Sequence, residues 1–464
     1  MAGGKLVGQL FSWVVTLVVI RLLSPGDYGL MALATLLLTL LNLVAELGLS
    51  FAIIQIENLT EKITKQCFGM ILVINVSLFL FFLLMSTYIA SFFNEPNLAP
   101  VIQLIAVSFL ITIFSIVPEA LLEREMQFKK ISLVNLIATV MGALATLVLA
   151  LLDYGVWALV WGNITQAATK TLGYNISGEK FILPSFDFTG MGKIISFSTA
   201  VAMERILFFF YTQADIFLIG KFLGKELLGV YSVASHIASL PMHKIMGSIN
   251  QVAFPAFSSI QSDKQTISKY ILKVSRLMSF VTFPVFWGMS CISAEFVVVV
   301  LGEKWVDAIL PLQLLTLIMP LRMLGNIMSI LLHGIGKANV AVVNLIISSI
   351  LMISAFYIGM DWGIIGVCYA WVTIFPIVFF ITTLRTMRTI ELKYILLLKT
   401  IFKPLIAATG MYLAVYAVRL ILPEGLNPLI SFSALIATGA LTYIVIIFAT
   451  ADELRHEVIG LFKK

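Results

Sequence analysis

The sequence predicts an all-α polytopic membrane protein with about 14 transmembrane helices. Three observations indicate this fold class: residues AVILMFWYC make up 60% of the 464-residue chain, charged residues make up only 12%, and the mean hydropathy is +1.04. A soluble chain of this length would form about three domains and carry about a quarter of its residues as charges. So few charges exclude soluble domains and disordered or coiled-coil chains.

Long apolar runs follow one another from end to end of the chain. A bilayer core about 30 Å thick requires roughly 20 apolar helical residues. Runs of about this length, bounded by charged residues, Pro, Gly or Asn, occur at residues 4–21, 29–54, 67–91, 100–120, 131–152, 155–173, 193–219, 227–249, 271–292, 308–332, 338–359, 363–383, 400–421 and 428–449. Each run is predicted to be one transmembrane helix.

The basic residues predict the orientation of these spans. With a cytoplasmic N-terminus, about 23 Lys and Arg residues fall on the cytoplasmic side and about 5 on the outer side, a strong positive-inside bias. An even number of spans then places both termini in the cytoplasm. The net charge of +6 is explained by this topology, since no dense basic stripe predicts binding to nucleic acid.

An internal repeat divides the chain. Four motif pairs recur in the same order at separations of about 200–210 residues: Arg21-Leu-Leu-Ser-Pro-Gly-Asp-Tyr-Gly-Leu with Lys221-Phe-Leu-Gly-Lys-Glu-Leu-Leu-Gly-Val-Tyr, Asp153-Tyr-Gly with Asp361-Trp-Gly, Val134-Asn-Leu-Ile with Val343-Asn-Leu-Ile, and Pro100-Val-Ile-Gln with Pro311-Leu-Gln-Leu. Six spans per half make the repeats parallel, with a substrate site expected between them. The matching Asn135 and Asn344 are expected to hydrogen-bond between helices.

The repeat predicts four parts of the chain. Residues 1–175 form an N-terminal six-helix lobe, and residues 176–192 form a cytoplasmic linker. Residues 193–390 form a C-terminal six-helix lobe, and residues 391–464 add a helix pair and a cytoplasmic tail.

Several motifs resemble those of bacterial polysaccharide exporters: the Arg21 motif above, Glu46-Leu-Gly-Leu, Ala52-Ile-Ile-Gln55, Leu122-Glu-Arg-Glu-Met-Gln-Phe128, Asp215-Ile-Phe-Leu-Ile-Gly220 and Leu228-Gly-Val-Tyr231. These exporters belong to the multidrug, oligosaccharidyl-lipid and polysaccharide transporter superfamily. The chain is most similar to its O-antigen and exopolysaccharide repeat-unit flippases.

The resemblance implies a mechanism, a cargo and a location. Two six-helix lobes would form a V and alternate access to a central cavity in the bacterial inner membrane. The cargo would be an undecaprenyl-diphosphate-linked oligosaccharide, moved from the cytoplasmic to the periplasmic leaflet. Partners in the same membrane would be a polysaccharide polymerase and glycosyltransferases, together with the membrane lipids.

Two arginines are placed near mid-membrane, where an ionisable group is expensive and is expected to face protein or a water-filled cavity. Arginine supplies the cationic, bidentate donors that a diphosphate requires. Helical spacing places further polar residues on the faces of these two arginines, so the cavity candidates are Arg205, Arg322, Glu204, Tyr211, Thr212 and Asn326. A structural ion pair of either arginine with Glu204 or Asp215 stays open as the alternative.

Four other ionisable residues are candidates for ion coupling: Glu46, Asp215, His236 and His243. Each has a structural alternative, since a membrane carboxylate can brace neighbouring helices and a histidine can simply be hydrogen-bonded. Two histidines on one helical stripe, titrating near neutral pH, would suit a proton carrier. The sequence leaves three energy sources for transport open: a proton gradient, a sodium gradient or consumption of the product.

Other function classes fit the sequence less well. A cation-coupled multidrug antiporter of the same superfamily is the main alternative, but it would require acidic rather than cationic cavity residues. A membrane-embedded glycosyltransferase or polymerase would require a large outer loop with carboxylates, and all outer loops here are short. The chain shows no zinc spacing, phosphate-binding loop or nucleophile motif. We therefore predict a transporter without enzymatic activity, metal or cofactor.

Overall fold

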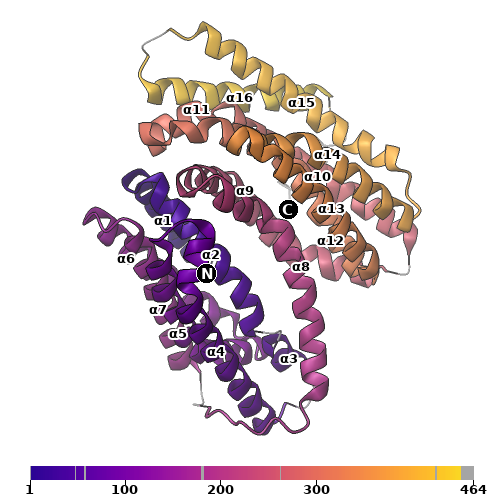
Figure 1. Ribbon diagram of the computed structural model, residues 1–464. Helices are drawn as coiled ribbons and strands as arrows, with labels where there is room; N and C mark the ends of the chain where they lie inside the picture. Colours follow the sequence, from indigo (N-terminus) through magenta and orange to yellow (C-terminus); the bar gives the residue numbers. More distant parts are fainter. Residues whose placement is uncertain are drawn as a thin grey trace. The chain divides into compact units, whose positions relative to one another are not determined.

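The computed structural model describes residues 2–46, 49–56, 59–178, 182–261, 263–423 and 426–450, and within them it contains helices but no strand (Figure 1). The long helices are α1 (Ala2–Leu22), α2 (Pro25–Glu46), α4 (Glu61–Phe93), α5 (Leu98–Arg124), α6 (Phe128–Leu151), α7 (Val156–Ser177), α8 (Gly192–Phe222), α9 (Lys225–Ser259), α10 (Lys264–Cys291), α12 (Ile309–Gly334), α13 (Ala338–Gly359), α14 (Gly363–Thr389), α15 (Tyr394–Ile421) and α16 (Pro428–Thr450). The short ones are α3 (Leu49–Gln55), α11 (Ser293–Phe296), the π-turn Val297–Leu301 and two 3₁₀ segments, Glu303–Ala308 and Met360–Trp362.

Many of these helices are long and apolar enough to cross a bilayer, so the chain is a multi-pass membrane protein. Across the described ranges, eight helical segments meet that criterion, or nine if α10 and the segment after it, bent by 66°, count as one span. Residues 338–389, which contain α13 and α14, enter this count as one segment of 52 residues. The predicted spans all fall on helices, and the number of fourteen stays a prediction.

The run predicted as a single helix over residues 29–54 is described in two helical parts, α2 up to Glu46 and the seven residues of α3, and residues 47–48 between them lie outside the described residues. The Arg124 guanidinium, at the end of α5, donates hydrogen bonds to the carbonyl oxygens of Ile53, Ile54 and Ile56 at 2.8, 3.2 and 2.6 Å. These carbonyls lie at the end of α3, where a helix leaves acceptors unpaired. Arg124 therefore stabilises a helix end that the continuous apolar run conceals.

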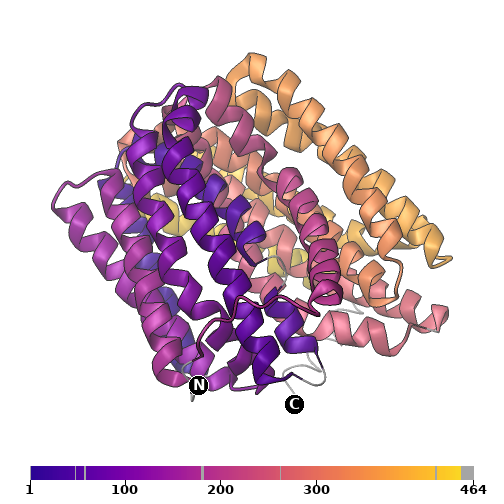
Figure 2. The same cartoon turned by 60° about the horizontal axis from the view of Figure 1, so that its bottom comes forward.

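The chain divides into two compact units, residues 1–232 and 233–464. In the first unit, α6 packs against α7 and α4 against α5; α6 and α7 lie side by side in Figures 1 and 2. Helix α8 also belongs to this unit, since it packs against α2 and α3. The lobe boundaries predicted from the repeat stay a prediction, because contact units need not coincide with repeats.

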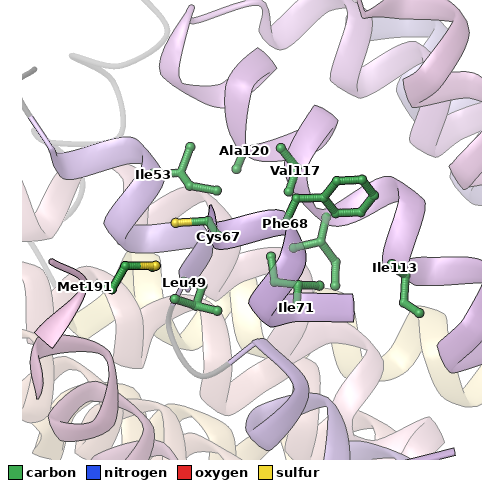
Figure 3. Close-up of a cluster of buried hydrophobic side chains, with 10 residues drawn as sticks. Leu49, Ile53, Cys67, Phe68, Ile71, Ile113, Val117, Ala120 and Met191 are labelled. Carbon is green, nitrogen blue, oxygen red and sulfur yellow. The ribbon is translucent and has the colours of Figure 1, made fainter. Parts of the chain in front are cut away.

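One apolar cluster lies in the core of the first unit. Figure 3 shows side chains from α3, α4 and α5 gathered in this cluster, among them Ile53, Cys67, Phe68 and Val117. Met191, the residue before α8, joins the same cluster and is 1% exposed. The cluster therefore connects Met191 of the linker to α3, α4 and α5, whose buried cluster residues lie 71 to 142 positions earlier in the chain.

The described linker residues 182–191, here called the strap, lie along the start of α4. The Gln66 amide donates to the carbonyl oxygens of Asp187 and Thr189 at 2.6 and 3.2 Å, and the Ser185 N–H donates to the carbonyl oxygen of Lys65 at 2.9 Å. A Cβ at Gly69 would lie 2.0 Å from the Ser185 carbonyl oxygen, so only glycine admits this approach. The strap is thus docked by backbone contacts.

An exposed carboxylate adds to this docking. The Asp187 side chain accepts hydrogen bonds from the hydroxyl and N–H of Thr189, and lies 3.4 Å from the Lys62 ammonium. Chiefly the Thr189 donors, and then Lys62, lower the pKa of Asp187. The Asp187 carboxyl is therefore ionised at neutral pH, where it accepts these hydrogen bonds.

A close approach joins the start of α2 to the start of α9, within the first unit. A Cβ at Gly29 would lie 1.8 Å from the carbonyl oxygen of Lys225, and a Cβ at Gly229 would lie 1.7 Å from that of Pro25. Gly29 and Gly229 are equivalent in the predicted repeat, as are Pro25 and Lys225. Gly29 therefore lies against the residue one helical turn before Gly229, and Gly229 lies against the residue one helical turn before Gly29.

In the second unit, α10 packs against α12, α12 against α14, and α13 against α14. The two orange helices α13 and α14 lie side by side in both views (Figures 1 and 2). The last pair, α15 and α16, packs on α10. Arg419 of α15 fixes this pair through a two-pronged ion pair with Glu295 at 3.0 and 2.6 Å and a hydrogen bond to the Cys291 carbonyl oxygen.

Candidate functional site

The polar stripe predicted on α12 lies on the less buried face of that helix. Arg322, Asn326 and His333 are half-buried and Ser329 is exposed, whereas most apolar residues between them are buried, namely Met323, Leu324, Ile327, Met328, Leu331 and Leu332. The buried face packs against α10 and α14. The apolar residues thus fix the helix in the unit and leave the stripe accessible.

Arg322 is held by two neutral side chains. Its guanidinium carbon lies 4.2 Å from the centroid of the Trp371 ring, on α14, which is a cation–π contact. One guanidinium nitrogen lies 4.0 Å from the sulfur of Met319, one turn earlier on α12. Among the residues that the structure describes, no carboxylate forms an ion pair with Arg322. The guanidinium therefore keeps its charge available to an anion.

The stripe on α8 is only partly described. Arg205 and Tyr211 are half-buried, and the side chain of Glu204 lies outside the described residues. The Thr212 hydroxyl donates back to the carbonyl oxygens of Phe208 and Phe209 at 3.0 and 3.2 Å. Thr212 can still accept a hydrogen bond from a ligand, but its proton is used within the helix.

Asp215, the last residue of that stripe, is buried at 6% exposure. The Tyr231 hydroxyl on α9 donates to its carboxylate at 2.5 Å, and Tyr231 is itself fully buried. The structure therefore places Asp215 in a hydrogen bond between α8 and α9.

The other ion-coupling candidates are scattered. His236 is exposed on α9. The side chains of Glu46 and His243 lie outside the described residues. In the described ranges, no three His, Cys, Asp or Glu side chains gather in a group able to hold a metal ion.

The two matching asparagines both join helices, as predicted. Asn135 on α6 lies 3.1 Å from the Tyr174 hydroxyl on α7, and Tyr174 also donates to Glu119 on α5 at 2.8 Å. Lys170 completes this group through an ion pair with Glu119 at 3.0 Å. In the second unit, Asn344 donates to the carbonyl oxygen of Thr382 and to the Thr386 hydroxyl, and it accepts from Arg385.

An apolar groove lies between α10, α15 and α16 in the second unit. Its volume is about 410 Å³, and Gly288 of α10 and Gly439 of α16 leave room where larger side chains would fill it. The one hydroxyl on its lining, that of Tyr443, donates to the Phe280 carbonyl oxygen at 2.9 Å. The groove therefore offers an apolar chain no polar partner and suits a hydrocarbon.

Sequence reasoning missed the partners of the predicted residues. Trp371 on α14 contacts Arg322 on α12, and Tyr231 on α9 donates a hydrogen bond to Asp215 on α8. In both pairs the partner lies on a different helix. No local pattern marks such pairs. The small residues along α10 and α16 are a signal for the groove, although the same residues also serve ordinary helix packing.

Long apolar helices, an accessible arginine without a carboxylate and an apolar groove define a multi-pass membrane transporter. The chain belongs to the polysaccharide biosynthesis protein family, which it matches over residues 18–310. It is 25% identical over 449 residues to an uncharacterized membrane protein in the cps region of Klebsiella pneumoniae, covering 96% of this chain and 92% of that one. It is 26% identical over 357 residues to the lipopolysaccharide biosynthesis protein WzxC of Escherichia coli K12, covering 75% and 72%.

Among solved structures, the lipid II flippase MurJ in an inward closed conformation shares this fold. The TM-score is 0.80 at 16% sequence identity, over 97% of this chain and 99% of that one. The predicted resemblance to the polysaccharide transporters is confirmed, and the family and structural neighbours are transporters or flippases rather than enzymes.

Proposed function

We propose that this protein is a flippase that moves undecaprenyl-diphosphate-linked oligosaccharide repeat units from the cytoplasmic to the periplasmic leaflet of the bacterial inner membrane, by alternating access around a cationic cavity. Both termini would lie in the cytoplasm. The two six-helix repeats would be the moving lobes, and the pairing of Gly29 with Lys225 and of Gly229 with Pro25 supports this layout.

The observation that carries the proposal is Arg322. A charged arginine at membrane depth is costly unless it has a partner. Its described partners, a ring face and a thioether, leave the charge uncompensated. A diphosphate would compensate it with a charge-assisted, two-pronged hydrogen bond. Arg205, Glu204, Tyr211, Thr212 and Asn326 remain candidates to line the same cavity.

The rest of the cargo has matching surfaces. The groove between α10, α15 and α16 is apolar throughout and would accommodate part of a polyprenyl chain. By their own descriptions, one relative is a lipopolysaccharide biosynthesis protein and the other is a membrane protein in the cps region. A cation-coupled multidrug antiporter is less well supported, because an uncompensated arginine repels a cationic drug.

The experiment uses cells that lack this protein. Extracted lipids are analysed by mass spectrometry for undecaprenyl-linked oligosaccharide. We expect a completed repeat unit to accumulate, and wild-type protein to reverse the accumulation. The Arg322→Ala variant should fail to reverse it at normal protein level. Arg388→Ala is the matched control, since Arg388 is an exposed arginine of the same unit and its side chain forms no hydrogen bond or ion pair with the described residues. No accumulation, with unchanged surface glycan, would refute the proposal.

The source of energy is a separate part of the proposal. Glu46, Asp215, His236 and His243 are the residues proposed to couple a proton or sodium gradient. Purified protein in vesicles that contain labelled cargo would be given each gradient in turn. Faster flipping with one gradient identifies the ion, whereas equal rates without any gradient point to consumption of the product. Glycosyltransferases would supply the cargo, and a polysaccharide polymerase would consume it, in the same membrane.

A further inference from the structure

The Trp371 side chain is buried, and its ring lies against the Arg322 guanidinium. It is 1% exposed, so in this structure its ring is not a surface on which a sugar can stack. The Arg322 guanidinium lies on that ring at 4.2 Å. The buried indole is therefore a support for a cation.

The ring is itself immobilised by other aromatic side chains. Phe356 on α13 and Phe375 on α14 lie with their centroids 5.2 and 5.6 Å from the Trp371 ring. Phe356 is fully buried and Phe375 is 6% exposed. Because dense packing restricts aromatic side chains to one orientation, the support for Arg322 is rigid.

The chemistry of the support matters as much as its rigidity. A carboxylate would orient the guanidinium but would also neutralise it and occupy its planar, two-pronged edge. The ring face of Trp371 and the sulfur of Met319 orient it without doing either. A guanidinium lying on a ring still directs its N–H bonds outward in its own plane, where they match two phosphate oxygens.

We propose that Trp371 is a positioning residue: it holds Arg322 in the orientation that binds the diphosphate of the cargo while leaving its charge intact. This inference rests on the proposed function and deepens it, because it names which group of the cargo Arg322 recognises. It also assigns Trp371 a role through Arg322, with no contact of its own to the cargo.

The test measures the binding of undecaprenyl diphosphate to purified full-length protein in detergent, with undecaprenyl monophosphate for comparison. Trp371→Leu removes the ring face and should weaken diphosphate binding between about threefold and thirtyfold, the range in which a cation–π contact contributes. Trp371→Phe keeps a smaller ring and should restore part of the loss. Trp362→Leu is the matched control, because Trp362 lies on the same unit but is 69% exposed; it should bind as the wild type does.

A double-mutant cycle separates positioning from simple structural damage. If Trp371 acts through Arg322, Trp371→Leu should have no further effect on binding in a protein that already carries Arg322→Ala. Equal losses in both backgrounds would overturn the inference, and so would unchanged binding by a folded Trp371→Leu protein. If Trp371→Leu fails to fold, Trp371→Phe decides the question. It should weaken diphosphate binding in the wild-type background and should have no effect on binding in the Arg322→Ala background.

The outcomes distinguish the inference from the function on which it rests. Wild-type binding by Arg322→Ala would remove the cationic site and with it the support for the proposed function. Weakened binding by Arg322→Ala, together with normal binding by Trp371→Leu, would leave the flippase proposal standing and refute only the role of Trp371. Equal affinity of the wild type for the monophosphate and the diphosphate would also refute recognition of the diphosphate.

Discussion

Replacing Gly229 with alanine tests whether the approach of α2 and α9 matters to stability. The new Cβ would lie 1.7 Å from the Pro25 carbonyl oxygen, whereas real Cβ atoms essentially never come closer than 3.0 Å to such an atom. The two backbones must therefore separate by about 1.3 Å. Forcing extra atoms into a packed interface costs roughly 1–3 kcal/mol.

Alanine also favours the helix over glycine by about 1 kcal/mol, which partly hides this cost. Gly247→Ala is the control that removes the ambiguity, because it lies on the same helix and a Cβ there meets nothing within 4 Å. Both variants gain the helical preference, and only one has the clash. Gly229→Ala should therefore be less stable than Gly247→Ala by about 1–3 kcal/mol.

The assay is unfolding of the purified protein from mild detergent by increasing fractions of sodium dodecyl sulfate, followed by circular dichroism. Gly29→Ala should behave like Gly229→Ala, since its Cβ would lie 1.8 Å from the Lys225 carbonyl oxygen. Equal stability of the Gly229 and Gly247 variants would refute the reasoning, because the close approach would then carry no energetic constraint.

Three further predictions concern polar contacts. Arg419→Ala leaves the Glu295 carboxylate, 16% exposed, without its partner, and should lower the free energy of unfolding by about 1–3 kcal/mol in the same assay. Asp215→Leu should cost a similar amount, about 1–3 kcal/mol, because it removes the carboxylate that accepts the hydrogen bond of the buried Tyr231 hydroxyl, whereas Asp215→Asn keeps an acceptor and should cost less; equal losses would contradict this. The pKa of Asp187 is lowered, so its contribution to strap docking is present at neutral pH and is lost as the pH falls through the folded-state pKa. Proteolysis of the strap should therefore become faster with acidification in the wild type but not in Asp187→Asn.

The elements of the fold were largely predictable from the sequence. Apolar runs about 20 residues long predict helices because the bilayer dictates that length, and the structure has α7 end at Ser177 and α8 begin at Gly192, near the limits of the predicted linker. The cap at the end of α3 was not predictable. Arg124, which the sequence offers only as a topological charge, donates to the carbonyl oxygens of Ile53 and Ile56, and no local pattern joins residues that lie 71 and 68 positions apart.

The candidate site was predictable only in part. Helical spacing placed Arg322 and Asn326 on one face, and the structure leaves that face accessible. The contact with Trp371 depends on how α12 packs against α14, and 49 positions separate the two residues in the chain. Asp215 and Tyr231 both occur in the motifs that carried the family resemblance, yet no spacing rule joins a residue of one helix to a residue of the next across a turn.

The docking of the strap also has a consequence for biosynthesis. Gln66 precedes its acceptor Asp187 by 121 residues, an interval that a ribosome covers in roughly 6–24 s at about 5–20 residues per second. During this interval α5, α6 and α7 enter the membrane while the start of α4 has no strap beside it. The amide of Gln66 and the surface at Gly69 are covered only when synthesis has passed residue 189. A fragment expressed to isolate the first six long helices must therefore extend through Met191, because one that stops at the end of α7 lacks the segment that closes its own core.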